Sequence, residues 1–131
     1  MITVVFACAH NAGRSQIAAA MFNAFADPAT ARALSAGTRP ADSVHPEVVE
    51  VMRELGVDLS SAKPRALDSD LTRAADWLIT MGCREECPVI PGVRRDDWPI
   101  DDPHGRALAD VRRIRDEIEL RVRSLLWLLN A

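Results

Sequence analysis

The chain has 131 residues, of which 48% are hydrophobic, and its formal net charge is −3 at neutral pH. These values favour one domain over residues 1–131, with a core large enough for independent folding. The 16 basic residues are scattered, which argues against nucleic acid as a main partner. There is no basic leader, and no apolar run approaches the ~18–20 residues that cross a bilayer, so we expect a cytoplasmic protein without a membrane partner.

Strands and helices alternate in the first half of the chain. Residues 2–7 are a continuous apolar, β-branched run, typical of a strand buried on both faces of a parallel sheet. From residue 15, apolar side chains recur at helical spacing as far as Asp27-Pro28, and residues 33–37 form the second expected strand. Pro46 at the start and Gly56 just beyond the end delimit a second helix over residues 47–55.

The second half continues this alternation. Residues 77–81 predict a third buried strand and residues 95–100 a shorter fourth strand. An apolar stripe from Leu108 to Leu129, opposed by charged residues, predicts a long helix. We therefore expect an α/β fold: a single three-layer domain with a four-stranded parallel sheet and helices on both faces. Ligands of such folds bind beyond the carboxyl ends of the strands.

The most informative segment is the loop between the first strand and the first helix, Cys-Ala-His-Asn-Ala-Gly-Arg-Ser. A tight loop there directs several backbone N–H groups at one point, and the helix macrodipole adds positive potential, so an oxyanion is expected to bind. Arg14 can donate in a planar fork to two oxygens of a tetrahedral anion, and the same field favours the thiolate of Cys8. The expected oxyanion-binding and supporting residues are Ala9, His10, Asn11, Ala12, Gly13 and Ser15.

Simpler structural roles compete with each of these assignments. Cys8 taken alone fits a small buried hydrophobe at the end of a strand, but the combination of strand, Cys-x5-Arg-Ser, glycine and helix favours a nucleophile. His10 is expected to point outward rather than to act as a base. Ser15 is expected to donate its hydroxyl to Cys8, and Asn11 to hold the strained loop through side-chain-to-backbone bonds.

Two further thiols, Cys83 and Cys87, follow the third strand and are expected at the same sheet edge as Cys8. An odd number of cysteines favours reactive thiols over a structural disulfide framework. The alternatives are two inert thiols or a zinc site. Zinc prefers four ligands, often in close pairs, and three cysteines with three unclustered histidines do not supply them, so no metal is expected.

Paired carboxylates, Asp101 and Asp102, precede Pro103. One of them can stand over the anion site as a proton donor, and Asp102 is the better candidate because it adjoins the proline. The competing explanation is a cap at the start of a helix, since aspartate before proline is a common helix-start signal. Structural roles are also expected for His45 and His104, which lie beside prolines.

Taken together, Cys8-x5-Arg14-Ser15, the sequence Ser-Ala-Gly-Thr at residues 35–38 and Asp101-Asp102-Pro103 resemble the low-molecular-weight protein tyrosine phosphatase fold over nearly the whole chain. Within that fold, Asn11, Ser15-Gln16, residues 80–83, Cys87-Pro88 and Trp98 resemble the thiol-dependent arsenate reductases. Some members carry a glutamate at a potassium site where this chain has Ala19 or a neighbouring alanine, so a bound potassium ion is not expected.

The resemblance implies that Cys8 attacks arsenate while Asp102 protonates the departing oxygen. Cys83 then attacks Cys8 and releases arsenite, and Cys87 attacks Cys83 to leave a disulfide. Only three residues separate Cys83 from Cys87, and in a helix their Cβ atoms would lie ~5–6 Å apart, beyond the ~3.5–4.5 Å of a disulfide, so the segment must unwind. No bound cofactor is implied. The external reductant would be thioredoxin, or mycothiol with mycoredoxin. Phosphate and sulfate would compete with arsenate. We expect the protein to be a monomer.

Two other functions remain open from the sequence. A phosphatase acting on phosphotyrosine or a small phosphomonoester would use Cys8, Arg14 and Asp102 in the same way. However, His104-Gly105 follows Pro103 where tyrosine phosphatases place aromatic residues for stacking on the substrate ring. A redox sensor would oxidise Cys8 reversibly and use the disulfide as a signal.

Overall fold

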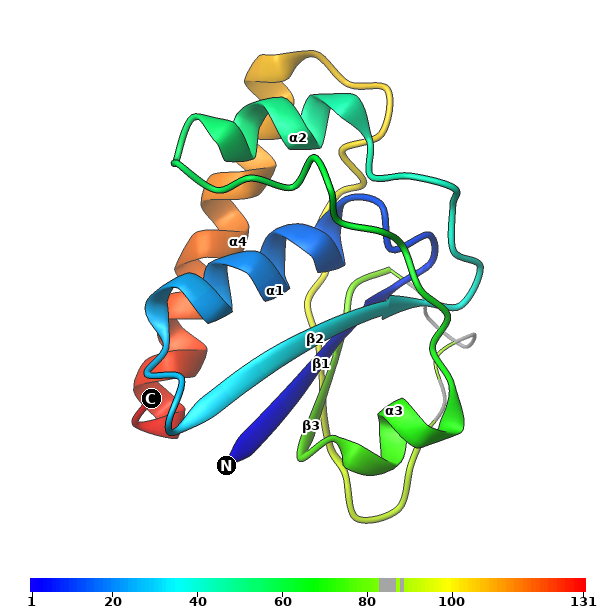
Figure 1. Cartoon of the computed structure of the whole chain (residues 1–131), viewed down its shortest axis with the longest axis vertical. Coiled ribbons are helices and arrows are strands. Elements are labelled where there is room, and N and C mark those ends of the chain that lie inside the picture. The colour runs from blue at the N-terminus through cyan, green and yellow to red at the C-terminus, as the bar shows by residue number, and fades with distance from the viewer. Residues whose placement is uncertain (83–86, 88) are drawn as a thin grey trace.

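Four parallel strands form the centre of the computed structural model, which describes residues 1–82, 87 and 89–131. The strands are β1 (Ile2–Cys8), β2 (Ala31–Gly37), β3 (Trp77–Thr80) and β4 (Arg94–Asp97), in the order β2-β1-β3-β4 (Figure 1). Because β2 and β3 lie on opposite sides of β1, the order of the strands reverses at β1. In parallel sheets a ligand-binding crevice opens at such a point, and Cys8 is the last residue of β1.

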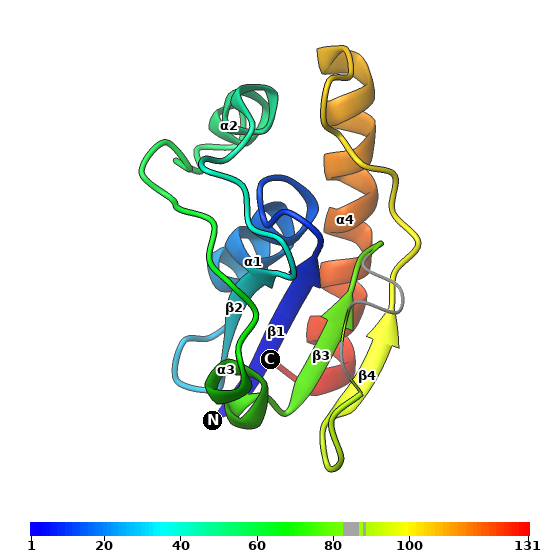
Figure 2. The same cartoon turned by 90° about the vertical axis from the view of Figure 1, so that its right-hand side faces the viewer.

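Helices cover both faces of this sheet, as the sequence predicts. One face carries α1 (Arg14–Phe25) and α4 (Leu108–Leu129), with α2 (Pro46–Arg53) packed on α4, and the other face carries α3 (Ser69–Ala74) (Figure 2). A large apolar cluster under α1 and α4 includes Phe6, whereas a smaller one under α3 includes Val5. Among the described residues, no helix combines the length and apolarity that crossing a membrane requires.

Aromatic packing fixes the chain beyond β4 against the core. The Phe6 ring lies 6.0 Å from that of Phe22 and 5.4 Å from that of Trp98, so β1, α1 and the segment after β4 are locked together. Strand β4 ends at Asp97, although the sequence predicts a strand over residues 95–100. Pro99 has no N–H to donate to a sheet ladder, and Trp98 and Ile100 are buried as non-strand residues instead.

Helix α3 is an element that the sequence did not predict. It has six residues, too few for an apolar periodicity to be recognised. Its start is nevertheless marked in the sequence, because the side chain of Asp68 accepts a hydrogen bond from the Leu71 N–H at 2.7 Å as an N-cap. The helix covers the second apolar cluster and closes the fold below β1 and β3.

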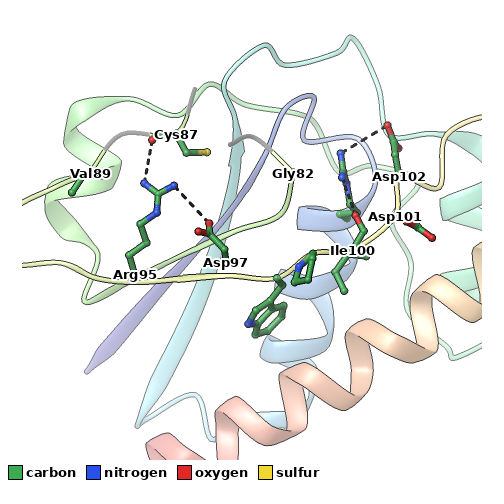
Figure 3. A pocket seen from close by; sticks show the side chains of 11 residues that line it. Gly82, Cys87, Val89, Arg95, Asp97, Ile100, Asp101 and Asp102 are labelled. Atoms are coloured by element: carbon green, nitrogen blue, oxygen red, sulfur yellow. Dashed lines mark hydrogen bonds and ion pairs between the residues drawn. The ribbon is translucent and has the colours of Figure 1, made fainter. Parts of the chain in front are cut away.

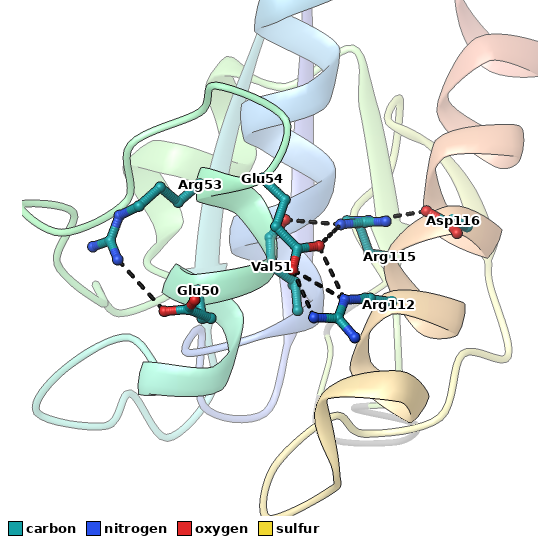
Figure 4. Close-up of polar contacts among 7 residues, drawn as sticks. All are labelled: Glu50, Val51, Arg53, Glu54, Arg112, Arg115 and Asp116. Atoms are coloured by element: carbon teal, nitrogen blue, oxygen red, sulfur yellow. Dashed lines mark hydrogen bonds and ion pairs between the residues drawn. The ribbon is translucent and has the colours of Figure 1, made fainter.

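A charged cluster ties α2 to α4 (Figure 4). Arg112 donates to both carboxylate oxygens of Glu54 at 2.8–3.1 Å, and Arg115 donates to Glu54 at 2.8 Å and to the carbonyl of Val51 at 2.9 Å. Hydrogen bonds from Arg112 and then from Arg115 lower the pKa of Glu54 below its usual range. Because Arg115 is buried, these bonds also satisfy its charge and hold the C-terminal end of α2 in place.

Candidate active site

The loop after β1 is oriented by the segment that follows β2. Four of its carbonyl groups accept hydrogen bonds of 2.7–3.2 Å from backbone N–H groups of residues 38–45. The donor and acceptor pairs are Thr38 to Cys8, Arg39 to Ala9, Ala41 to His10, and His45 to Ala12. The C=O and N–H of one peptide point in opposite directions, so the N–H groups that follow these carbonyls face away from that segment. In the part of the chain that the structure describes, the N–H groups of residues 9–14 donate to no protein atom.

These free N–H groups lie at the start of a helix. Helix α1 begins at Arg14, its N-cap Gly13 provides no side-chain bond, and no acidic residue stands in its first turn. The positive end of the macrodipole is therefore not neutralised by the protein. Loop and helix together offer an oxyanion several donors and a positive potential.

Close approach of two backbones requires a glycine at residue 37. A Cβ on Gly37 would lie 2.7 Å from the carbonyl oxygen of Ala9 and 2.9 Å from the N of Asn11. Either contact would push the loop away from residues 38–45 and disturb its carbonyl bonds. The backbone of residues 35–38 thus contacts the anion loop and holds its position.

Asn11 holds the loop in its unusual conformation. Its φ of 49° is in the left-handed region, and its side chain is completely buried. The side-chain amide donates to the hydroxyl of Ser15 at 2.7 Å, while its oxygen accepts from Gln16 at 3.2 Å and from the Arg65 N–H at 2.9 Å. The side-chain amide of Asn11 thereby contacts Ser15, Gln16 and Arg65, and His10 beside it is exposed.

Cys8 is a free cysteine that is only 2% exposed, and its sulfur lies 2.9 Å from the hydroxyl of Ser15. Since Asn11 already donates to that hydroxyl, the hydrogen of Ser15 is available for the sulfur. When Cys8 is a thiolate, Ser15 must be the donor, and the order of donors runs from Asn11 through Ser15 to Cys8. A thiolate at Cys8 would accept the last of these bonds.

Each terminal nitrogen of the Arg14 guanidinium has a partner, Ile100 for one and Asp102 for the other, and Figure 3 labels both partners. The guanidinium donates to the carbonyl of Ile100 at 3.1 Å and lies 3.8 Å from a carboxylate oxygen of Asp102. Gly82, at φ +80°, lies against the guanidinium so closely that an added Cβ would overlap it. The side chain is 11% exposed, so its direction is set by these neighbours rather than by solvent.

The two carboxylates before Pro103 face in different directions. Asp102 reaches toward Arg14, whereas Asp101 reaches Arg113 of α4 at 3.8 Å. The other oxygen of Asp102 accepts from the His104 N–H at 3.0 Å, so this side chain also caps a turn. Helix α4 begins later, at Leu108 with Ala107 as its N-cap, and Asp102 is therefore not a helix cap.

A pocket of about 940 Å³ connects this region with Cys87. Its walls include Arg14, Gly82, Cys87, Val89, Arg95, Asp97, Trp98, Pro99, Ile100, Asp101 and Asp102. Cys87 is 3% exposed and disulfide-bonded, and Figure 3 shows its sulfur directed toward the side of the pocket where Ile100 and Asp102 lie. Arg95 donates to the carbonyl of Cys87 at 3.1 Å and lies 3.6 Å from Asp97.

The structure thus brings Arg14, Asp102 and Cys87 into the walls of one pocket, while Cys8 is buried against Ser15 at the start of the loop that leads to Arg14. Cys83 and the predicted unwinding of the segment around it lie outside the described residues. Sequence reasoning missed the contact of Gly82 with Arg14 and the bond from Arg95 to Cys87. A glycine directly after a strand was the only signal for the first, and an arginine in a short strand is no signal for the second.

The fold and this loop define a class of protein. The chain belongs to the family of low molecular weight phosphotyrosine protein phosphatases, which it matches over residues 3–131. Among its relatives is a protein from Halobacterium salinarum described as a putative arsenate reductase. It is 44% identical over 128 residues, which cover 92% of this chain and 87% of the relative.

Solved structures of related proteins agree with this placement. The thioredoxin-dependent arsenate reductase of Corynebacterium glutamicum superposes with a TM-score of 0.86 at 40% identity. The match covers 99% of this chain but 62% of that one, so our chain spans less than two thirds of its length. An arsenate reductase solved in a phosphate-binding state has a TM-score of 0.83 at 25% identity, with 98% and 99% of the two chains covered.

Proposed function

We propose that this protein reduces arsenate to arsenite, with Cys8 as the nucleophile. The N–H groups of the loop and the guanidinium of Arg14 bind the oxyanion, and the Cys8 thiolate attacks arsenic. Asp102 gives a proton to the departing oxygen, which leaves as water, and a covalent Cys8–arsenic bond forms. Arsenic is still in the +5 state after this step. The 3.8 Å between Asp102 and Arg14 supports this assignment, whereas Asp101 is turned toward α4.

The reducing electrons come from thiols in the second half of the proposed reaction. The Cys83 thiolate attacks the sulfur of Cys8, a disulfide forms, and the electron pair of the sulfur–arsenic bond leaves with arsenic as arsenite. Cys87 then attacks Cys83, which frees Cys8 and leaves a second disulfide for an external dithiol to reduce. Thioredoxin is the proposed reductant, as it is for the related thioredoxin-dependent arsenate reductase of Corynebacterium glutamicum.

The observation that carries the proposal is the position and state of Cys87. Its sulfur is disulfide-bonded in the wall of the pocket that also holds Arg14 and Asp102, while Cys8 is a free thiol. This distribution supports a relay in which Cys87 forms the last disulfide and Cys8 is regenerated as a thiol. A phosphatase needs the anion loop and Asp102 but has no use for a redox-active thiol in the same pocket.

Selectivity between arsenate and phosphate then depends on the second half of the reaction. The two anions have nearly the same shape and charge, and the loop donors contact only oxygens, so both should bind. A related arsenate reductase solved in a phosphate-binding state supports this expectation. Arsenic(V) accepts two electrons from thiols readily and phosphorus(V) does not, so phosphate and sulfate act as competitors rather than as alternative substrates.

The test is NADPH oxidation that depends on arsenate, thioredoxin and thioredoxin reductase. Cys8→Ser should abolish it, while Cys87→Ser should release one arsenite per chain and then stop. Mass spectrometry of the stalled protein should show a Cys8–Cys83 disulfide. Normal turnover of Cys87→Ser with thioredoxin would refute the relay. Turnover that requires mycothiol and mycoredoxin and does not occur with thioredoxin would identify the former as the reductant. Hydrolysis of phosphomonoesters without arsenate reduction would favour a phosphatase.

Asp101 and Asp102 provide a matched pair of variants for the first step. Asp102→Asn should slow formation of the Cys8 adduct while phosphate still binds, because proton donation is lost and the loop is unchanged. Asp101→Asn should have little effect, since that side chain pairs with Arg113. A larger defect in Asp101→Asn would show that the wrong carboxylate was assigned.

A further inference from the structure

A second group of polar side chains lies next to the anion loop without taking part in it. The His45 and His104 rings stack with their centroids 4.1 Å apart, and His104 Nδ1 lies 3.7 Å from a carboxylate oxygen of Glu47. Each of these three side chains offers one atom that could bind a metal ion. Among the described residues, these three atoms form a cluster in which every pair lies within 4.8 Å. The sequence predicts no metal site because its histidines are far apart, but the fold brings two of them together.

The donor set suits a particular kind of ion. Two imidazole nitrogens and one carboxylate oxygen are ligands of zinc, and three protein ligands leave a fourth position for water. Around a tetrahedral zinc ion with bonds of about 2.0 Å, ligand atoms are about 3.3 Å apart, so the group must contract by up to about 1.5 Å. The side chain of His104 is 67% exposed and can rotate by that amount, while the partly buried His45 and Glu47 form a fixed base.

We propose that His45, Glu47 and His104 bind one zinc ion, which joins the start of α2 to the segment carrying Asp102. That segment already contacts α2 and its N-cap through the hydrogen bond from the Gly105 N–H to Glu47 at 3.1 Å, the approach of His104 to Glu47 and the stacking of His104 on His45. A metal would add a bond through His104, two residues after Asp102, and through His45, whose N–H donates to the loop carbonyl of Ala12. The ion would thus restrain both sides of the anion site without contacting the substrate.

The test is a zinc titration that excludes the thiols, which also bind zinc. We would use the C8S/C83S/C87S protein and measure zinc binding by calorimetry, with folding checked by circular dichroism. One zinc per chain is expected, and His104→Ala and Glu47→Gln should each weaken binding by at least about tenfold, the scale on which even outer-shell changes act. The matched controls are His10→Ala, an exposed histidine outside the group, and Glu50→Gln, one turn further along α2.

A second measurement does not depend on affinity or activity. Zinc should slow hydrogen exchange of the Gly105 and Arg106 amides in the same protein, and His104→Ala should remove that protection. Absence of binding in the cysteine-free protein, or binding that survives His104→Ala and is lost in His10→Ala, would overturn the proposal. Neither outcome bears on arsenate reduction, because the readouts use no turnover.

Discussion

The contact of Gly82 with Arg14 permits a sharp test of how the anion site is positioned. An alanine at residue 82 would place a methyl group in the space of the guanidinium, with the central carbon only 3.0 Å away. To restore van der Waals contact, the guanidinium must move by about 1 Å. That shift would break the 3.1 Å bond to the Ile100 carbonyl and turn the donor fork away from the loop.

The expected loss has two parts of different origin. At φ +80° a Cβ costs roughly 1–2 kcal/mol of stability, whatever its surroundings. Misplacement of a substrate-positioning group by about 1 Å costs on the order of a hundredfold in rate. Gly92 separates the two parts, because its φ is +83° and an added Cβ would meet nothing within 4 Å. Gly92→Ala should therefore lose stability alone.

Urea unfolding and arsenate-dependent NADPH oxidation measure the two parts separately, and phosphate competition reports anion binding without turnover. Both variants should lose similar stability, and only Gly82→Ala should lose activity and phosphate affinity. Gly82→Ala with wild-type kinetics would refute the view that Gly82 sets the direction of Arg14. An equal loss of activity in Gly92→Ala would show that the loss in Gly82→Ala comes from backbone strain and not from displacement of Arg14.

Three further outcomes follow from the contacts described. Ser15→Ala should slow alkylation of Cys8 by iodoacetamide by about threefold to tenfold, because one hydrogen bond to the thiolate is lost; an unchanged rate would contradict the donor order. Asn11→Ala should cost about 1–3 kcal/mol in urea unfolding by leaving the Arg65 N–H unpaired, and Asn11→Gly should recover the backbone part of that loss. Glu54→Gln should lower the melting temperature at pH 7. Because the folded pKa of Glu54 is depressed, its stabilising contribution is present above the ordinary value of 4.5 and is lost as the pH falls through the folded value, so variant and wild type should converge there.

The sequence predicted the elements that can be recognised from a local pattern of apolar residues. The apolar run of β1, the helical spacing of α1 and the long stripe of α4 each depend on neighbouring residues, and all three elements occur in the structure. The anion loop was predictable for the same reason, since strand, loop and helix are contiguous. Helix α3 was missed because six residues carry no periodicity, although Asp68 marked its start.

Contacts between distant segments could not be predicted in this way. The stacking of His45 on His104 and the bond from Arg95 to the Cys87 carbonyl join residues that no local pattern relates. Asp102 was a choice between proton donor and cap, and its two oxygens face both Arg14 and the turn at His104. Only the folded chain shows that one carboxylate contacts both Arg14 and the turn.

The bonds from residues 38–45 to the loop carbonyls have a consequence for protein design. Residues 8–15 resemble a portable motif, and grafting them between the strand and helix of another parallel sheet is an obvious experiment. In such a graft the carbonyls of Cys8, Ala9, His10 and Ala12 would have no donors to hold them outward. The peptide planes would be free to turn and present oxygens to the anion, which repels them. A transplant must therefore carry residues 37–45 as well, because the proposed anion site depends on two segments, and one of them acts only by holding the other.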